Sequence, residues 1–106
     1  MEWVTGDTKP DITARLPLLD IDGEETGSYA DLTGASVMFQ MRRPDDKRFT
    51  VNQPATVDDP PNGSVSYVWA TNDLSVPGDY YVQWEVTWPD SSKQTSRVAE
   101  ITIRRQ

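Results

Sequence analysis

The stretch Pro77-Gly78-Asp79-Tyr80-Tyr81-Val82-Gln83-Trp84-Glu85-Val86-Thr87-Trp88 decides the fold class of this chain. After the Pro-Gly turn the side chains alternate in two sets, which are Tyr80, Val82, Trp84, Val86 and Trp88 against Tyr81, Gln83, Glu85 and Thr87. Because successive side chains of a β-strand leave opposite faces, this alternation predicts a strand with one buried face. The aromatic rings of the first set place this strand at the centre of the core.

The rest of the chain extends the same pattern. Turn residues recur at short intervals and no segment keeps a helical period, which is typical of an all-β chain. We expect inward side chains in four more segments, namely Ile12, Ala14, Leu16 and Leu18; Val37, Phe39 and Met41; Val65, Tyr67 and Trp69; and Ala99, Ile101 and Ile103. Pro54 interrupts a strand, so residues 55–57 are expected to form either an edge or a new strand. Residues 24–29 are polar and predict an exposed excursion.

Length and composition restrict the fold and the chemistry. The 106 residues suit one domain, an immunoglobulin-like antiparallel β-sandwich of about seven strands. Residues 1–10 can form an extended N-terminal arm to this single domain, 1–106. Cysteine and histidine are both absent, which removes thiol chemistry and the commonest general base. The net charge of −7 opposes binding to nucleic acid.

The hydropathy pattern disfavours contact with membranes. No apolar run approaches the roughly 18 residues of a membrane span, so we expect no membrane partner. The start of the chain, Met1-Glu2-Trp3, leads into no long apolar segment, so we expect no signal peptide.

The acidic residues predict turns rather than a metal or catalytic site. Asp20-Ile21-Asp22-Gly23-Glu24-Glu25 resembles the start of a calcium loop, but the twelfth position from Asp20 is Asp31 and not the required glutamate. Glu85 belongs to the set of side chains on the outward face of its strand, which we call outward parity. This favours a solvated or interface position over catalysis. The sequence therefore predicts no catalytic residue, no metal site and no cofactor.

The candidate functional residues are those that can contact a partner. Trp3 precedes the first strand among few apolar residues, so it either meets a neighbouring subunit or folds back onto the core. The outward parity of Met38, Val68 and Tyr81 makes them further interface candidates. Arg104 and Arg105 form a basic end that either binds an acidic neighbour or phosphate, or stays solvated.

Several segments in a fixed order carry a family resemblance. They are Thr5-Gly6-Asp7-Thr8 with Pro10; Asp31-Leu32-Thr33-Gly34-Ala35-Ser36-Val37 with Phe39-Gln40-Met41-Arg42; Gly63-Ser64-Val65-Ser66-Tyr67-Val68-Trp69; and the stretch 77–90 with Ile101-Thr102-Ile103. In their joint order and spacing they make the chain similar to the immunoglobulin-like N-terminal domain of phage baseplate upper proteins.

The resemblance implies a function without catalysis. It implies a structural component of a tailed-phage virion, most simply an assembly module of the tail tip or baseplate, built in the host cytoplasm. Its partners would be other virion proteins, met in several copies of a symmetric assembly. A capsid decoration or head-to-tail accessory protein is the alternative within this class. A carbohydrate- or host-surface-binding module is the alternative of another class, and it would need exposed aromatic rings.

Overall fold

The computed structural model of the protein describes residues 2–19, 22 and 24–105. These residues form an all-β fold with a single short 3-10 turn, η1 (Pro60–Asn62). The strands are β1 (Glu2–Val4), β2 (Ile12–Arg15), β3 (Pro17–Leu19), β4 (Glu25–Tyr29), β5 (Ser36–Arg42), β6 (Phe49–Pro54), β7 (Thr56–Asp59), β8 (Ser64–Tyr67), β9 (Gly78–Thr87), β10 (Lys93–Thr95) and β11 (Ala99–Arg104).

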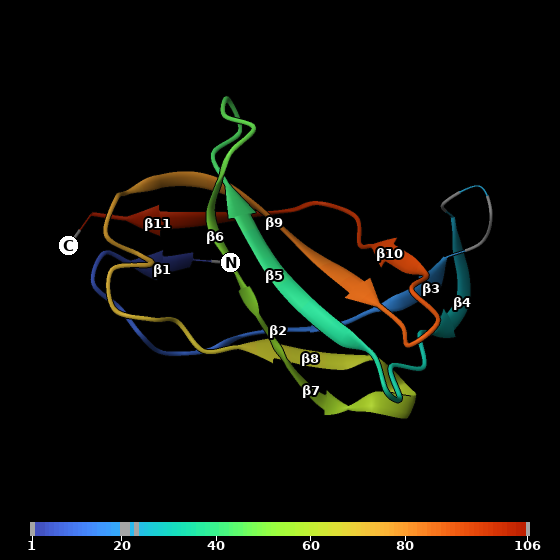
Figure 1. The fold of residues 1–106 in the computed structure, drawn as a ribbon. Helices are drawn as coiled ribbons and strands as arrows, with labels where there is room; N and C mark the ends of the chain where they lie inside the picture. The colour runs from blue at the N-terminus through green and yellow to red at the C-terminus, as the bar shows by residue number, and fades with distance from the viewer. Residues whose placement is uncertain (1, 20–21, 23, 106) are drawn as a thin grey trace.

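The larger sheet is built around β9, the strand that the sequence placed at the centre. Its order is β1-β11-β9-β5-β6, and β10 also pairs with β9 (Figure 1). The β5–β9 pair is antiparallel and runs in register from Ser36 opposite Thr87 to Arg42 opposite Tyr81. β1 instead runs parallel to β11, with Trp3 opposite Ile103. This sheet therefore contains both antiparallel and parallel pairs.

The smaller sheet has the order β2-β8-β7 and lies beside the larger one (Figure 1). The chain passes between the sheets at Ala55, which separates β6 from β7. Pro54 has no N–H for a sheet hydrogen bond, and β6 ends there. The sequence-based prediction of an edge or a new strand after Pro54 is confirmed.

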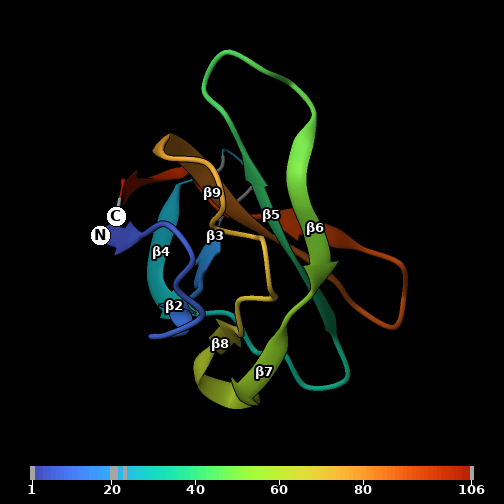
Figure 2. The same cartoon turned by 90° about the vertical axis from the view of Figure 1, so that its left-hand side faces the viewer.

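The core lies between the two sheets. The rings of Phe39, from β5, and Tyr67, from β8, stack with centroids 4.6 Å apart, and Trp84 of β9 lies 4.9 Å from Phe39. Figure 2 shows β7 and β8 on one side of β5 and β9. The predicted inward set of β9 is confirmed for its four members within the strand, which are Tyr80, Val82, Trp84 and Val86. Trp88 follows β9 and is partly buried against this core.

Some predicted inward positions are wrong. Leu18 is 41% exposed because the first predicted strand breaks near Leu16, and its second part turns into the two-stranded β3–β4 sheet. Ala99 begins β11 beside the interruption between β10 and β11, and it is exposed. Ile101 and Ile103 are buried as predicted.

The described residues form more strands than the roughly seven expected from the sequence. Part of the difference is the β3–β4 hairpin, where the chain was expected to make only a polar excursion. All five residues of β4 are exposed, so the exposure was predicted correctly and the strand was missed. Another part is β10, which is separated from β11 by residues 96–98.

Candidate interaction surface

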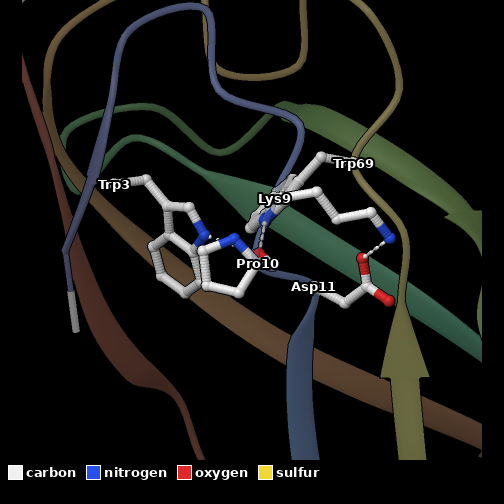
Figure 3. Close-up of polar contacts among 5 residues, drawn as sticks. All are labelled: Trp3, Lys9, Pro10, Asp11 and Trp69. Carbon is white, nitrogen blue, oxygen red and sulfur yellow. Dashed lines mark hydrogen bonds and ion pairs between the residues drawn. The ribbon is translucent and has the colours of Figure 1, made fainter.

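Trp3 lies in the core and not on the surface. It is 4% exposed, and its ring meets the edge of Trp69 with centroids 5.3 Å apart. Its indole N–H donates to the carbonyl oxygen of Pro10 at 2.8 Å, and the indole N–H of Trp69 donates to the same oxygen at 3.1 Å (Figure 3). Of the two positions that the sequence left open, the structure shows the one folded back onto the core. The buried indole offers almost no surface to a neighbouring subunit.

The segment around Trp3 is integrated into the domain. Residues 2–4 form a strand of the larger sheet, so here the chain does not extend away as an arm. Lys9 and Asp11, which flank Pro10, form an ion pair at 3.0 Å (Figure 3). Sequence reasoning missed this arrangement because β1 pairs with the far end of the chain.

Two of the predicted interface residues, Met38 and Tyr81, lie on the outer face of the larger sheet. Beyond Ser36 with Thr87, the register of β5 and β9 forms three facing pairs on this side, which are Met38 with Glu85, Gln40 with Gln83, and Arg42 with Tyr81. Because facing residues of paired strands point to the same side of a sheet, these six side chains form one surface. We call these three pairs the outer face.

The centre of the outer face is a row of amide side chains. The Gln83 amide N–H donates to the Gln40 side-chain oxygen at 2.8 Å, and the Gln40 amide donates to the Asn52 side-chain oxygen at 3.4 Å. Gln40 is only 6% exposed, and none of the described residues has a buried side-chain N or O atom without a partner. Since these amides bond mainly to one another, covering them costs less desolvation than covering unpaired polar groups.

The two ends of the outer face differ in charge and chemistry. At one end, the Arg42 guanidinium lies 5.1 Å from the centre of the Tyr81 ring. Arg42 also donates to the backbone oxygens of Arg43 and Asp46, at 3.4 Å each, which holds it at the β5–β6 turn. At the other end, the carboxylate of Glu85 lies 3.8 Å from the amine of Lys93, beside Met38. The face therefore has a cationic aromatic end and an end with a carboxylate and a thioether.

The remaining predicted interface residues lie elsewhere. Val68 is 54% exposed, as its parity predicted, but it follows β8 of the smaller sheet. Arg104 and Arg105 are exposed at the end of the chain, and Arg104 forms an ion pair with Glu2 of the adjacent β1. The structure thus brings Met38 and Tyr81 together and leaves Val68, Arg104 and Arg105 apart from them. The amide row and Arg42 were missed, although their outward parity was a signal.

Asp31 and Asp90 accept local hydrogen bonds at turns, whereas Asp58 and Asp59 lie in β7 and Glu25 begins β4. Hydrogen bonds from the hydroxyl and then the backbone N–H of Thr33 lower the pKa of Asp31 below its usual value. Asp90 is held in the same way by Ser92. Of the calcium-loop candidate, Asp20, Ile21 and Gly23 lie outside the described residues. Within residues 2–19, 22 and 24–105 no group of three or more acidic side chains could hold a metal ion.

In the part of the chain that the structure describes, no helix has the length and apolarity required to cross a bilayer.

Comparison with known proteins gives one family. The family model described as the BppU N-terminal domain matches residues 19–104. The match contains β4 to β11, and with them both strands of the outer face. No curated protein matches the chain.

Proposed function

The chain belongs to the BppU N-terminal domain family, and we propose that it is a non-enzymatic assembly module of the tail tip or baseplate of a tailed phage. The family is that of a phage baseplate upper protein, which is a structural component of the virion and assembles with other phage proteins. The observation that carries the proposal is the match over residues 19–104, which includes most of the core strands.

The proposal includes an immunoglobulin-like topology. In that fold, strands C, F and G form one sheet, strands B, E and D belong to the other, and a tyrosine near the start of F bonds back to the backbone. The order β11-β9-β5 corresponds to G-F-C, and the order β2-β8-β7 to B-E-D. The hydroxyl of Tyr80, near the start of β9, donates to the carbonyl oxygen of Val76 at 2.9 Å. These correspondences support an immunoglobulin-like sandwich with the β3–β4 hairpin inserted between B and C.

The module would act by presenting rigid surfaces. The aromatic rings of the core are packed between the sheets, which supports a scaffold role over stacking on sugars. A scaffold of this kind contributes orientation: each copy holds its outer face and its strand edges at fixed angles to its neighbours. We propose that several copies occupy a symmetric ring, where repeated weak contacts add up.

Particle labelling tests this function. Purified particles of the phage that encodes the chain would be labelled with gold-conjugated antibodies against the folded domain and imaged by electron microscopy. The proposal expects gold at the distal end of the tail. A second phage that lacks the coding sequence serves as the control for antibody specificity. Label on the capsid, or particles without label despite detectable protein in the lysate, would overturn the proposal.

A further inference from the structure

We infer that the outer face binds the outer face of a second copy of this chain, related by a two-fold axis that crosses the strands above Gln40 and Gln83. This inference stands on the register and chemistry of the face, and it does not depend on the proposed place of the protein in a virion. The occupant is therefore specified as another copy of the same domain.

The register makes the face suited to such an axis. Tyr81 and Glu85 are on the same side of β9, about 14 Å apart at 3.4 Å per residue, with Gln83 midway between them. A two-fold axis that lies parallel to the sheet and perpendicular to the strands exchanges the two ends. It therefore places the Arg42–Tyr81 pair of one copy over the Met38–Glu85 pair of the other.

The two ends are chemically complementary when they meet. Arg42 gains the carboxylate of Glu85 from the second copy, one strand spacing of about 4.8 Å to the side and within reach of the long side chains. The Tyr81 ring lies near the thioether of Met38, a favourable sulfur–aromatic contact. Each contact forms twice because the interface is two-fold symmetric. In the middle, the Gln40 and Gln83 amides of the two copies meet.

Charge distribution favours this face for contact between identical chains. The whole chain carries −7, so most surfaces of two copies repel each other. The charged residues of the outer face are Arg42 and Glu85, and beside them on the neighbouring strands lie Lys93, the ion-pair partner of Glu85, and Glu100, opposite Tyr81 on β11. The two cations and two anions balance. An acidic protein therefore meets its own copy here without the repulsion that its acidic loops produce.

The size of the face predicts a weak dimer. With β6 beside β5, and β10 and β11 beside β9, the surface around the outer face is four strands wide. At about 4.8 Å per strand and seven residues of about 3.4 Å each, it measures roughly 450 Å². Stable complexes bury about 800 Å² on each partner, so this association needs high concentration or a shared attachment. Copies held side by side in an assembly meet the second condition.

Sedimentation velocity of the purified protein, from about 10 μM to about 1 mM, tests the inference. We expect a concentration-dependent shift from monomer to dimer. Arg42→Glu or Glu85→Arg alone should weaken dimerisation at least about tenfold, because each places like charges opposite each other. An equimolar mixture of the two variants should restore dimerisation, since the heterodimer re-forms both opposite-charge contacts.

Matched charge reversals away from the face serve as controls. Arg105→Glu changes an exposed residue that follows β11, and Glu25→Arg changes an exposed residue of β4. Neither should alter dimerisation more than about twofold. Far-ultraviolet circular dichroism and thermal melting establish that all variants are folded. Wild type that stays monomeric throughout, or variants whose mixture is no better than either alone, would overturn the inference.

Discussion

Trp3 and Trp69 donate their indole N–H groups to one acceptor, the carbonyl oxygen of Pro10. Trp3 belongs to β1 of the larger sheet, and Trp69 follows β8 of the smaller sheet. Pro10 precedes β2, so this one oxygen connects the start of the chain to both layers. The arrangement explains how a three-residue edge strand is held in place.

Replacing Trp3 tests this role. Trp3→Ala should lower the free energy of unfolding by about 3–5 kcal/mol, because it leaves a cavity and removes a hydrogen bond. Trp3→Phe keeps an aromatic ring but loses the N–H donor, and it should cost less. Urea unfolding followed by circular dichroism measures both changes. A loss below about 0.5 kcal/mol for Trp3→Ala would show that the indole is not part of the core.

The hydroxyl of Tyr80 provides a second test, of the bond to the Val76 carbonyl. Tyr80→Phe removes this bond and should lower the free energy of unfolding by about 1 kcal/mol. Tyr81→Phe is the matched control, since the neighbouring ring points to the outer face and its hydroxyl bonds to none of the residues that the structure describes. Equal effects of the two substitutions in thermal melting would contradict the assigned role of Tyr80.

The stability of the fold should depend on pH in the alkaline range through the pair of Tyr67 and Asp73. Burial, and then the carboxylate of Asp73 that accepts its hydroxyl at 2.6 Å, raise the pKa of Tyr67 well above its usual value. A raised pKa in the folded state means that this stabilisation is complete below about pH 10 and is lost as the pH rises above it. Ultraviolet titration of tyrosinate should therefore find one tyrosine that ionises later than the others.

The variant Asp73→Ala separates the two causes. It removes the acceptor of the Tyr67 hydroxyl and of the Ala70 N–H, so it should bring the pKa of Tyr67 down and cost about 2 kcal/mol of stability at neutral pH. A titration curve unchanged from wild type would mean that the carboxylate does not contribute. Asp73→Asn controls for side-chain size.

Gly63 and Gly27 have similar φ angles, so comparing them separates the cost of backbone strain from the cost of a steric clash. Gly63 has φ +70° and a Cβ there would lie 2.7 Å from the Leu16 carbonyl oxygen, while Gly27 has φ +89° and open space around it. Gly27→Ala should cost about 1–2 kcal/mol from backbone strain alone. Gly63→Ala should cost distinctly more, because backbone atoms must also move. Chemical unfolding of both variants gives the comparison, and equal costs would argue against close packing at Gly63.

The sequence predicted the structure best for a strand that has one face toward the core and the other toward solvent. The alternation through Tyr80, Val82, Trp84 and Val86 identified β9 because burial on one face produces a local period of two. β4 was missed as a strand for the same reason, since all of its side chains are exposed and give no such period. Its pairing with β3 depends on hydrogen bonds that local composition does not reveal.

Positions fixed by distant segments could not be predicted. The environment of Trp3 depends on β11 and on Pro10, and no local pattern in residues 2–4 predicts either contact. Gln40 has outward parity, which predicts exposure, yet it lies against Gln83 and Asn52 from two other strands. Met38 and Tyr81 were identified by parity alone, whereas their membership of one face required the β5–β9 register.

The parallel pairing of β1 with β11 has a consequence for biosynthesis. Trp3 leaves the ribosome well before its strand partner Ile103. A nascent chain that stops before β11 therefore has no strand against which β1 can pair, and the indole of Trp3 loses that side of its enclosure. This edge of the larger sheet therefore closes only after the whole span from β1 to β11 has been made.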